Sequence, residues 1–132
     1  TTAYQRNLKS LLQKIEQTQH FIKNTLHNKQ QPFIAFHDAF QYFEVENGLN
    51  YIDSISFDDE SGSGLRHIQT ITDNIDNHNI QCLVYQPPKP AIIDALIKRT
   101  TIKATALDPL GLNLNDNKNA WFDIMRQLAL NF

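Results

Sequence analysis

A histidine and a carboxylate stand side by side where a short apolar run ends. His37 and Asp38 directly follow the run at residues 33–36. An imidazole beside a carboxylate invites the idea of acid–base catalysis, and either group alone could be a ligand. Two further polar residues end apolar runs in the same way, namely Gln86 after residues 82–85 and Asp108 after residues 101–107. These are the candidate site residues.

The elements that position these residues follow from the spacing of the apolar side chains. Leucine and isoleucine recur at helical spacing from about residue 3 to 28, and Thr1 or Thr2 could cap this helix. Strands are predicted at 33–36, 49–56, 82–85 and 101–107, and each is followed by a helix. This alternation predicts an α/β fold with a four-stranded parallel sheet, helices on both faces and a long N-terminal helix before it. In such sheets, ligands bind beyond the carboxyl ends of the strands.

Composition limits the class of protein. The chain has 132 residues, of which 41% are hydrophobic, so it is the size of one domain with a substantial core. Its net charge of −2 is spread along the sequence, which argues against nucleic acid as the main partner. The single Cys82 excludes an internal disulfide and a CxxC metal site.

Several motifs together resemble a known family. "FHDAFQYF", then "GLN", an acidic loop with Glu60, and "LDPLG" resemble the zinc and manganese substrate-binding proteins of ABC transporters, and most of all their ZnuA-like zinc-binding members. Members of this family have two α/β lobes joined by one long helix. The resemblance implies that residues 1–30 correspond to the interlobe helix and residues 31–132 to the C-terminal metal-binding lobe. The N-terminal lobe has no counterpart in this sequence.

The resemblance also implies a metal site. The His of the "HDA" motif, here His37, is a family ligand, and the Asp of "LDPLG", here Asp108, is a ligand in some members. Two further histidine ligands belong to the N-terminal lobe. Manganese-type members often carry Glu where His37 stands, and imidazole suits tetrahedral zinc. Gln86 replaces a glutamate common in zinc-type members, so a carboxylate that could orient an imidazole is lost.

The implied function is high-affinity zinc binding as the substrate-binding component of an ABC metal-uptake transporter, with zinc as the transported ligand. The partners would be zinc, a membrane permease and the N-terminal lobe of the same protein, in the periplasm or on the cell surface. The alternatives are a manganese-specific homologue and a doubly wound module for a ligand other than a metal. An enzyme is not expected, because the chain has no GxSxG nucleophile turn.

Simpler interpretations remain for individual residues. Asp108 precedes Pro109 and could be a turn residue, and Asp38 could cap the next helix. The acidic residues 58–60 are expected to form a solvated loop. Cys82 is expected to be a buried, inert strand residue. In the first half of the long helix, Leu8, Leu11 and Leu12 are expected to lack cover within one lobe.

Overall fold

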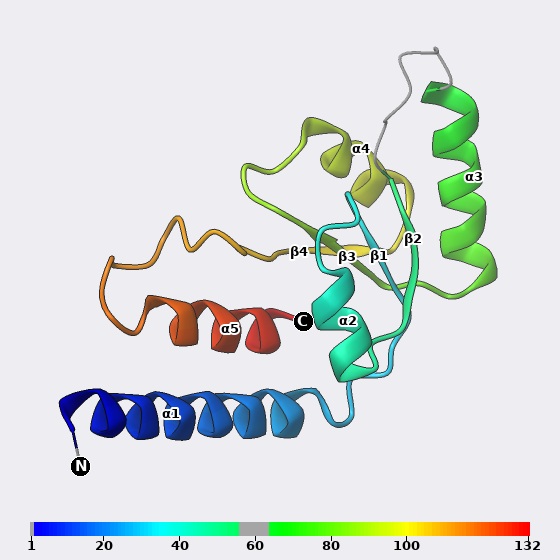
Figure 1. Cartoon of the computed structure of the whole chain (residues 1–132). Coiled ribbons are helices and arrows are strands. Elements are labelled where there is room, and N and C mark those ends of the chain that lie inside the picture. Colours follow the sequence, from blue (N-terminus) through cyan, green and yellow to red (C-terminus); the bar gives the residue numbers. More distant parts are fainter. Residues whose placement is uncertain (1, 56–63) are drawn as a thin grey trace. The chain divides into compact units, whose positions relative to one another are not determined.

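A computed structural model of the chain describes residues 2–55 and 64–132, so the predicted acidic loop at 58–60 lies outside the described residues. The chain forms two compact units, one made of Thr1–Asn28 with Asp108–Phe132 and the other of Lys29–Leu107. The elements follow in the order α1 (Ala3–Leu26), β1 (Phe33–Ala35), α2 (Gln41–Asn47), β2 (Tyr51–Ser54), α3 (Gly64–Asn77), β3 (Cys82–Tyr85), α4 (Ala91–Arg99), β4 (Lys103–Ala106) and α5 (Ala120–Asn131) (Figure 1).

The unit Lys29–Leu107 is built on a four-stranded parallel sheet with the order β2-β1-β3-β4. The predicted fold class is therefore confirmed. In register, Ile34 pairs with Leu83 and Leu83 with Ala104, so the carboxyl ends of β1, β3 and β4 lie at the same edge. This is the edge at which a parallel sheet places its ligands.

Both faces of the two central strands, β1 and β3, are buried. Successive strand residues point to opposite faces. One face packs with α3 and α4 through Ile34, Leu83, Ile71, Ile75, Ile93 and Leu96. On the other face, Phe33, Ala35 and Val84 are buried as well. This burial explains why β1 and β3 are continuous apolar runs instead of alternating ones.

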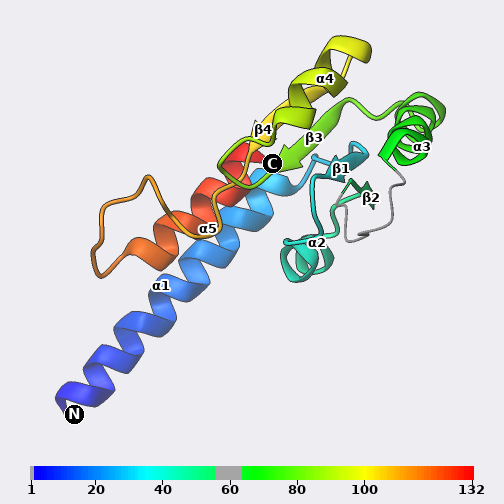
Figure 2. The ribbon, with the colours of Figure 1, turned by 90° about the horizontal axis from the view of Figure 1, so that it is seen from above.

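The other unit consists of α1, α5 and the segment that leads into α5. Thr2 caps α1 in a capping box with Gln5, as one of the two predicted caps. The two helices run side by side in both views (Figures 1 and 2). Ile22 and Leu26 of α1 are buried, as are Leu128 and Ala129 of α5. Only the second half of α1 therefore contributes to the core of this unit.

The first half of α1 is exposed, as predicted. The exposed fractions are 56% for Leu8, 48% for Leu11 and 55% for Leu12. Among the described residues, no helix is both long enough and apolar enough to cross a membrane.

The beginning of α2 differs from the sequence prediction. We expected Asp38 to cap this helix, but the N-cap residue is Phe40, which makes no side-chain capping bond. The reason is a tight turn at His37 that delays the helix until Gln41. At the other end of α2, the C-cap residue Gly48 adopts a left-handed conformation with φ of 62°.

Candidate metal centre

His37 is held at the carboxyl end of β1 by two backbone hydrogen bonds. The N–H of Phe36 donates to the carbonyl of Val84 at 2.8 Å and extends the pairing with β3 by one residue. The carbonyl of His37 then accepts the N–H of Ala39 at 2.9 Å, which closes a three-residue turn. The His37 ring is half-buried and meets the Phe36 ring edge-to-face, with 6.3 Å between centroids. The backbone of His37 is thus held at the edge of the sheet formed by the carboxyl ends of the strands.

Asp108 stands two residues after β4, and its carboxylate organises the loop that follows. Its Oδ1 accepts the N–H of Leu110 at 3.2 Å, and its Oδ2 accepts the N–H of Asn113 at 3.3 Å. The interpretation of Asp108 as a turn residue is therefore correct. A carboxylate oxygen has two lone-pair sites, so each oxygen keeps one for a cation. The side chain is half-buried.

Gly111 lets this loop close. Its φ of +66° lies in the left-handed region that favours glycine. A Cβ at this position would lie 2.8 Å from Cδ1 of Ile124, which is on α5. The "DPLG" sequence thus combines a carboxylate that binds two backbone N–H groups with a glycine that permits close approach to α5.

Gln86 follows β3 directly and is half-buried. The preceding residue, Tyr85, accepts the N–H of Leu107 at 2.8 Å through its carbonyl, so β3 and β4 stay paired up to this edge. A neutral amide therefore stands at the end of the strand between β1 and β4. It could accept a hydrogen bond from an imidazole N–H but would add no charge.

Glu44 is a buried carboxyl group that sequence reasoning did not identify. It is only 5% exposed, and its Oε1 has no hydrogen-bond partner among the described residues. Burial raises the pKa of Glu44 to about 7, and the charge of Asp38 acts in the same direction. The sequence did carry a signal, because Glu44 lies four residues after Phe40 and so shares its buried helix face.

The predicted site residues do not form a complete ligand set by themselves. His37 belongs to the unit Lys29–Leu107, and Asp108 begins the second segment of the other unit. Within residues 2–55 and 64–132, no three His, Cys, Asp or Glu side chains are placed to hold a metal together. Each predicted ligand is therefore an individual donor at a strand end.

Cys82 is only half-buried, although we expected full burial. The reason is its place at the start of β3, where it pairs with Lys103 of β4. Desolvation still raises the pKa of this thiol, although a hydrogen bond with Thr105 and the charge of Lys29 act in the opposite direction. The thiolate, which is the reactive form, is therefore disfavoured.

Comparison with known proteins assigns a family to this arrangement. The family model described as "Zinc-uptake complex component A periplasmic" (ZnuA) matches residues 1–132. The chain is 35% identical over 105 residues to a protein of Haemophilus ducreyi named high-affinity zinc uptake system protein ZnuA. It is 32% identical over 128 residues to the protein of that name from Brucella abortus. The matched regions cover 79% and 96% of this chain but only 34% and 38% of those relatives.

Solved structures share the fold. A crystal structure of ZnuA matches with a TM-score of 0.76 and 20% identity, over 96% of this chain and 47% of that one. The laminin-binding protein Lbp of Streptococcus pyogenes matches with a TM-score of 0.72 and 23% identity, over 96% and 49%. The chain thus spans about a third of the curated relatives and about half of these solved chains. Because the family model covers its whole length, this chain belongs to the ZnuA family of zinc-uptake proteins.

Proposed function

We propose that this chain is the C-terminal lobe of the zinc-binding component of an ABC metal-uptake transporter. His37 and Asp108 would each supply a zinc ligand, and residues 31–132 would form the lobe, with residues 1–30 as the interlobe helix. The observation that supports the proposal is the position of His37 directly after β1, at the carboxyl ends of the parallel strands in a member of the ZnuA family.

The chemistry of the donors fits zinc. A neutral imidazole and a carboxylate both occur among the ligands of tetrahedral zinc. Asp108 keeps one lone-pair site on each oxygen after its two backbone bonds, so it can bind a cation without releasing the loop. Capture requires no chemistry on the ion, since the ligands only replace its water shell.

A second lobe of the same protein would complete the site. It would bring the two remaining histidine ligands that the family resemblance implies. The exposed leucines on the first half of α1 offer it an apolar contact surface. The loaded protein would deliver zinc to a membrane permease from the periplasm or the cell surface, and no catalytic step is involved.

The test is a calorimetric zinc titration of the 132-residue chain, repeated with His37→Ala. With two of four ligands present, we expect only millimolar affinity, about 4 kcal/mol. His37→Ala should abolish this binding. His78→Ala is the control, because His78 is exposed just beyond the end of α3 and its ring contacts the backbone carbonyl of Asn74.

Two outcomes would overturn this assignment. One is nanomolar zinc binding by the chain alone, which would require a complete ligand set elsewhere. The other is equal zinc binding by the His37→Ala and His78→Ala variants. A parallel titration with manganese should give weaker binding, because imidazole prefers zinc to this harder ion.

A further inference from the structure

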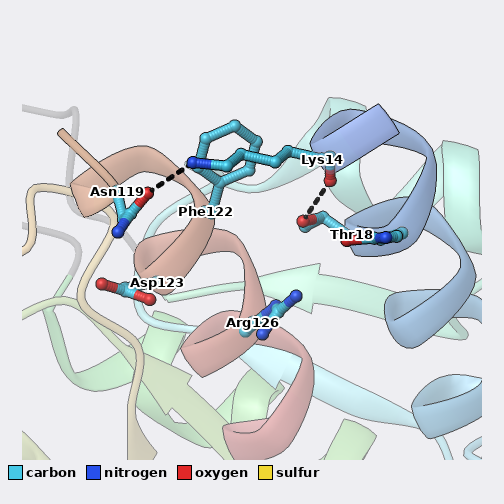
Figure 3. Close-up of a pocket in the computed structure, with 7 residues that line it drawn as sticks. Lys14, Thr18, Asn119, Phe122, Asp123 and Arg126 are labelled. Carbon is cyan, nitrogen blue, oxygen red and sulfur yellow. Dashed lines mark hydrogen bonds between the residues drawn. The ribbon is translucent and has the colours of Figure 1, made fainter. Parts of the chain in front are cut away.

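A pocket outside the proposed metal centre lies between α1 and α5. It has a volume of about 250 Å³ and lies entirely within the unit formed by Thr1–Asn28 and Asp108–Phe132. Its lining includes Lys14, Thr18, Asn119, Phe122, Asp123 and Arg126 (Figure 3). Asn119 is the N-cap of α5, and Phe122, Asp123 and Arg126 lie on one face of that helix.

The pocket is rich in hydrogen-bond donors that are held in place. The Lys14 ammonium donates one bond to Oδ1 of Asn119 at 3.1 Å, with the Phe122 ring centroid 5.8 Å from the nitrogen. An ammonium has three donors, so two remain. Because Oδ1 of Asn119 is engaged, its amide nitrogen is oriented as a further donor. Thr18 is buried and uses its hydroxyl proton on the carbonyl of Lys14, so its oxygen can only accept.

Arg126 adds a second positive charge to the lining. Its guanidinium lies over the Phe21 ring, 5.4 Å from the centroid. In the part of the chain that the structure describes, Arg126 forms no ion pair. The aromatic ring limits the positions of the guanidinium without using its five N–H donors.

The charge of the lining is positive overall. Lys14 and Arg126 contribute two positive charges, and Asp123 contributes one negative charge. Within the described residues, Asp123 forms an ion pair with neither cation. The pocket therefore combines a net charge of +1 with donors from both helices, which favours an anion over a cation or a neutral molecule.

The size of the pocket is compatible with a small anion. Its volume of about 250 Å³ has room for an oxyanion of a few heavy atoms. The planar fork of Arg126 matches the geometry of carboxylate and phosphate groups. We propose that the α1–α5 pocket binds a small oxyanion, a carboxylate or a phosphate, held by Lys14, Asn119 and Arg126.

The test is a titration of the 132-residue chain with succinate and with inorganic phosphate, followed by NMR at the backbone amides of Asn119 and Asp123. Saturable shifts with either anion, absent with chloride at equal ionic strength, support the proposal. A response to succinate alone identifies a carboxylate site, and a response to phosphate alone identifies a phosphate site. No saturable shift with either anion would overturn it.

Matched variants sharpen this test. Arg126→Gln and Lys14→Gln should each increase the half-saturating concentration about tenfold or more, because each removes a charge-assisted bond. Asp123→Asn should lower it, because the net charge rises from +1 to +2. Arg99→Gln, an exposed arginine at the end of α4, is the control and should change nothing. Weaker binding in Asp123→Asn, or equal effects of Arg126→Gln and Arg99→Gln, would contradict the proposal.

Discussion

The buried Glu44 makes the stability of this fold depend on pH. Its pKa rises from 4.5 to about 7 in the folded chain, so the folded state holds a proton that the unfolded state releases above pH 4.5. Stability is therefore highest below pH 4.5 with respect to this group, and it falls as the pH rises to about 7. Above pH 7, Glu44 is ionised in the folded state as well, and the loss of folding stability reaches its full value of at most about 3 kcal/mol.

We predict that Glu44→Gln stabilises the chain at pH 8, because it replaces an ionised buried carboxylate with a neutral group of the same shape. At pH 4 the two proteins should differ little. Urea unfolding at both pH values measures this, with Glu46→Gln, an exposed substitution on the same helix, as the control. Equal or lower stability of the Glu44→Gln variant at pH 8 would contradict this prediction, because it would show that ionised Glu44 does not destabilise the folded chain.

At the same scale, the sequence located some candidate residues and missed others. His37 and Asp108 could be identified because each follows an apolar run, and an alternating α/β pattern places strand ends at one edge. The bonds from the N–H groups of Leu110 and Asn113 to Asp108 could not be predicted, since they depend on the path of the loop. The burial of Glu44 depends on which face of α2 packs inward.

At the scale of elements, the loop after β4 depends on one glycine. Gly111 combines a positive φ with close contact to Ile124, whereas Gly48 has a similar φ of +62° and nothing within 4 Å of the place that an added methyl group would take. Gly48→Ala should cost about 1–2 kcal/mol for the left-handed backbone alone. Gly111→Ala should cost about 1–3 kcal/mol more than that, because the new methyl group overpacks against Ile124.

Urea unfolding measures the loss of stability in each alanine variant, and the difference between the two losses is the steric contribution of the contact with Ile124. The Gly111→Ala variant should also alter the amide signals of Leu110 and Asn113, because the loop that Asp108 organises must shift. Equal losses of stability in the two variants would mean that α5 shifts at no cost to accommodate the methyl group and that Gly111 does not determine the conformation of the loop.

The elements themselves followed from the sequence, but their ends did not. The parallel pairing agrees with the expected α/β pattern, because buried parallel strands leave distinct apolar runs. The predicted strands at 49–56 and 101–107 are shortened to Tyr51–Ser54 and Lys103–Ala106. The apolar pattern indicates which residues are buried and does not show where the strand hydrogen bonds end. Ile55 and Leu107, for example, are fully buried although they lie beyond the ends of their strands.

At the scale of the molecule, α1 has two halves with different roles. Leu26 is 2% exposed, whereas Leu12 is 55% exposed. Leu26→Ala should cost about 2–5 kcal/mol, because it leaves a cavity in the core. Leu12→Ala should change the stability by no more than about 0.5 kcal/mol, because it removes little buried contact. A large loss of stability for Leu12→Ala in urea unfolding would contradict the proposal that this half of α1 contacts another lobe.

The central claim is that His37 is a zinc ligand in a two-lobe protein. The most direct measurement is competitive zinc titration of a chimera that joins the N-terminal part of the Haemophilus ducreyi relative to this chain. We predict tight zinc binding that His37→Ala weakens by more than about 100-fold, a greater loss than removal of an outer hydrogen-bond partner causes. His78→Ala should leave the affinity unchanged. Zinc affinity equal in the His37→Ala and His78→Ala chimeras would contradict the account.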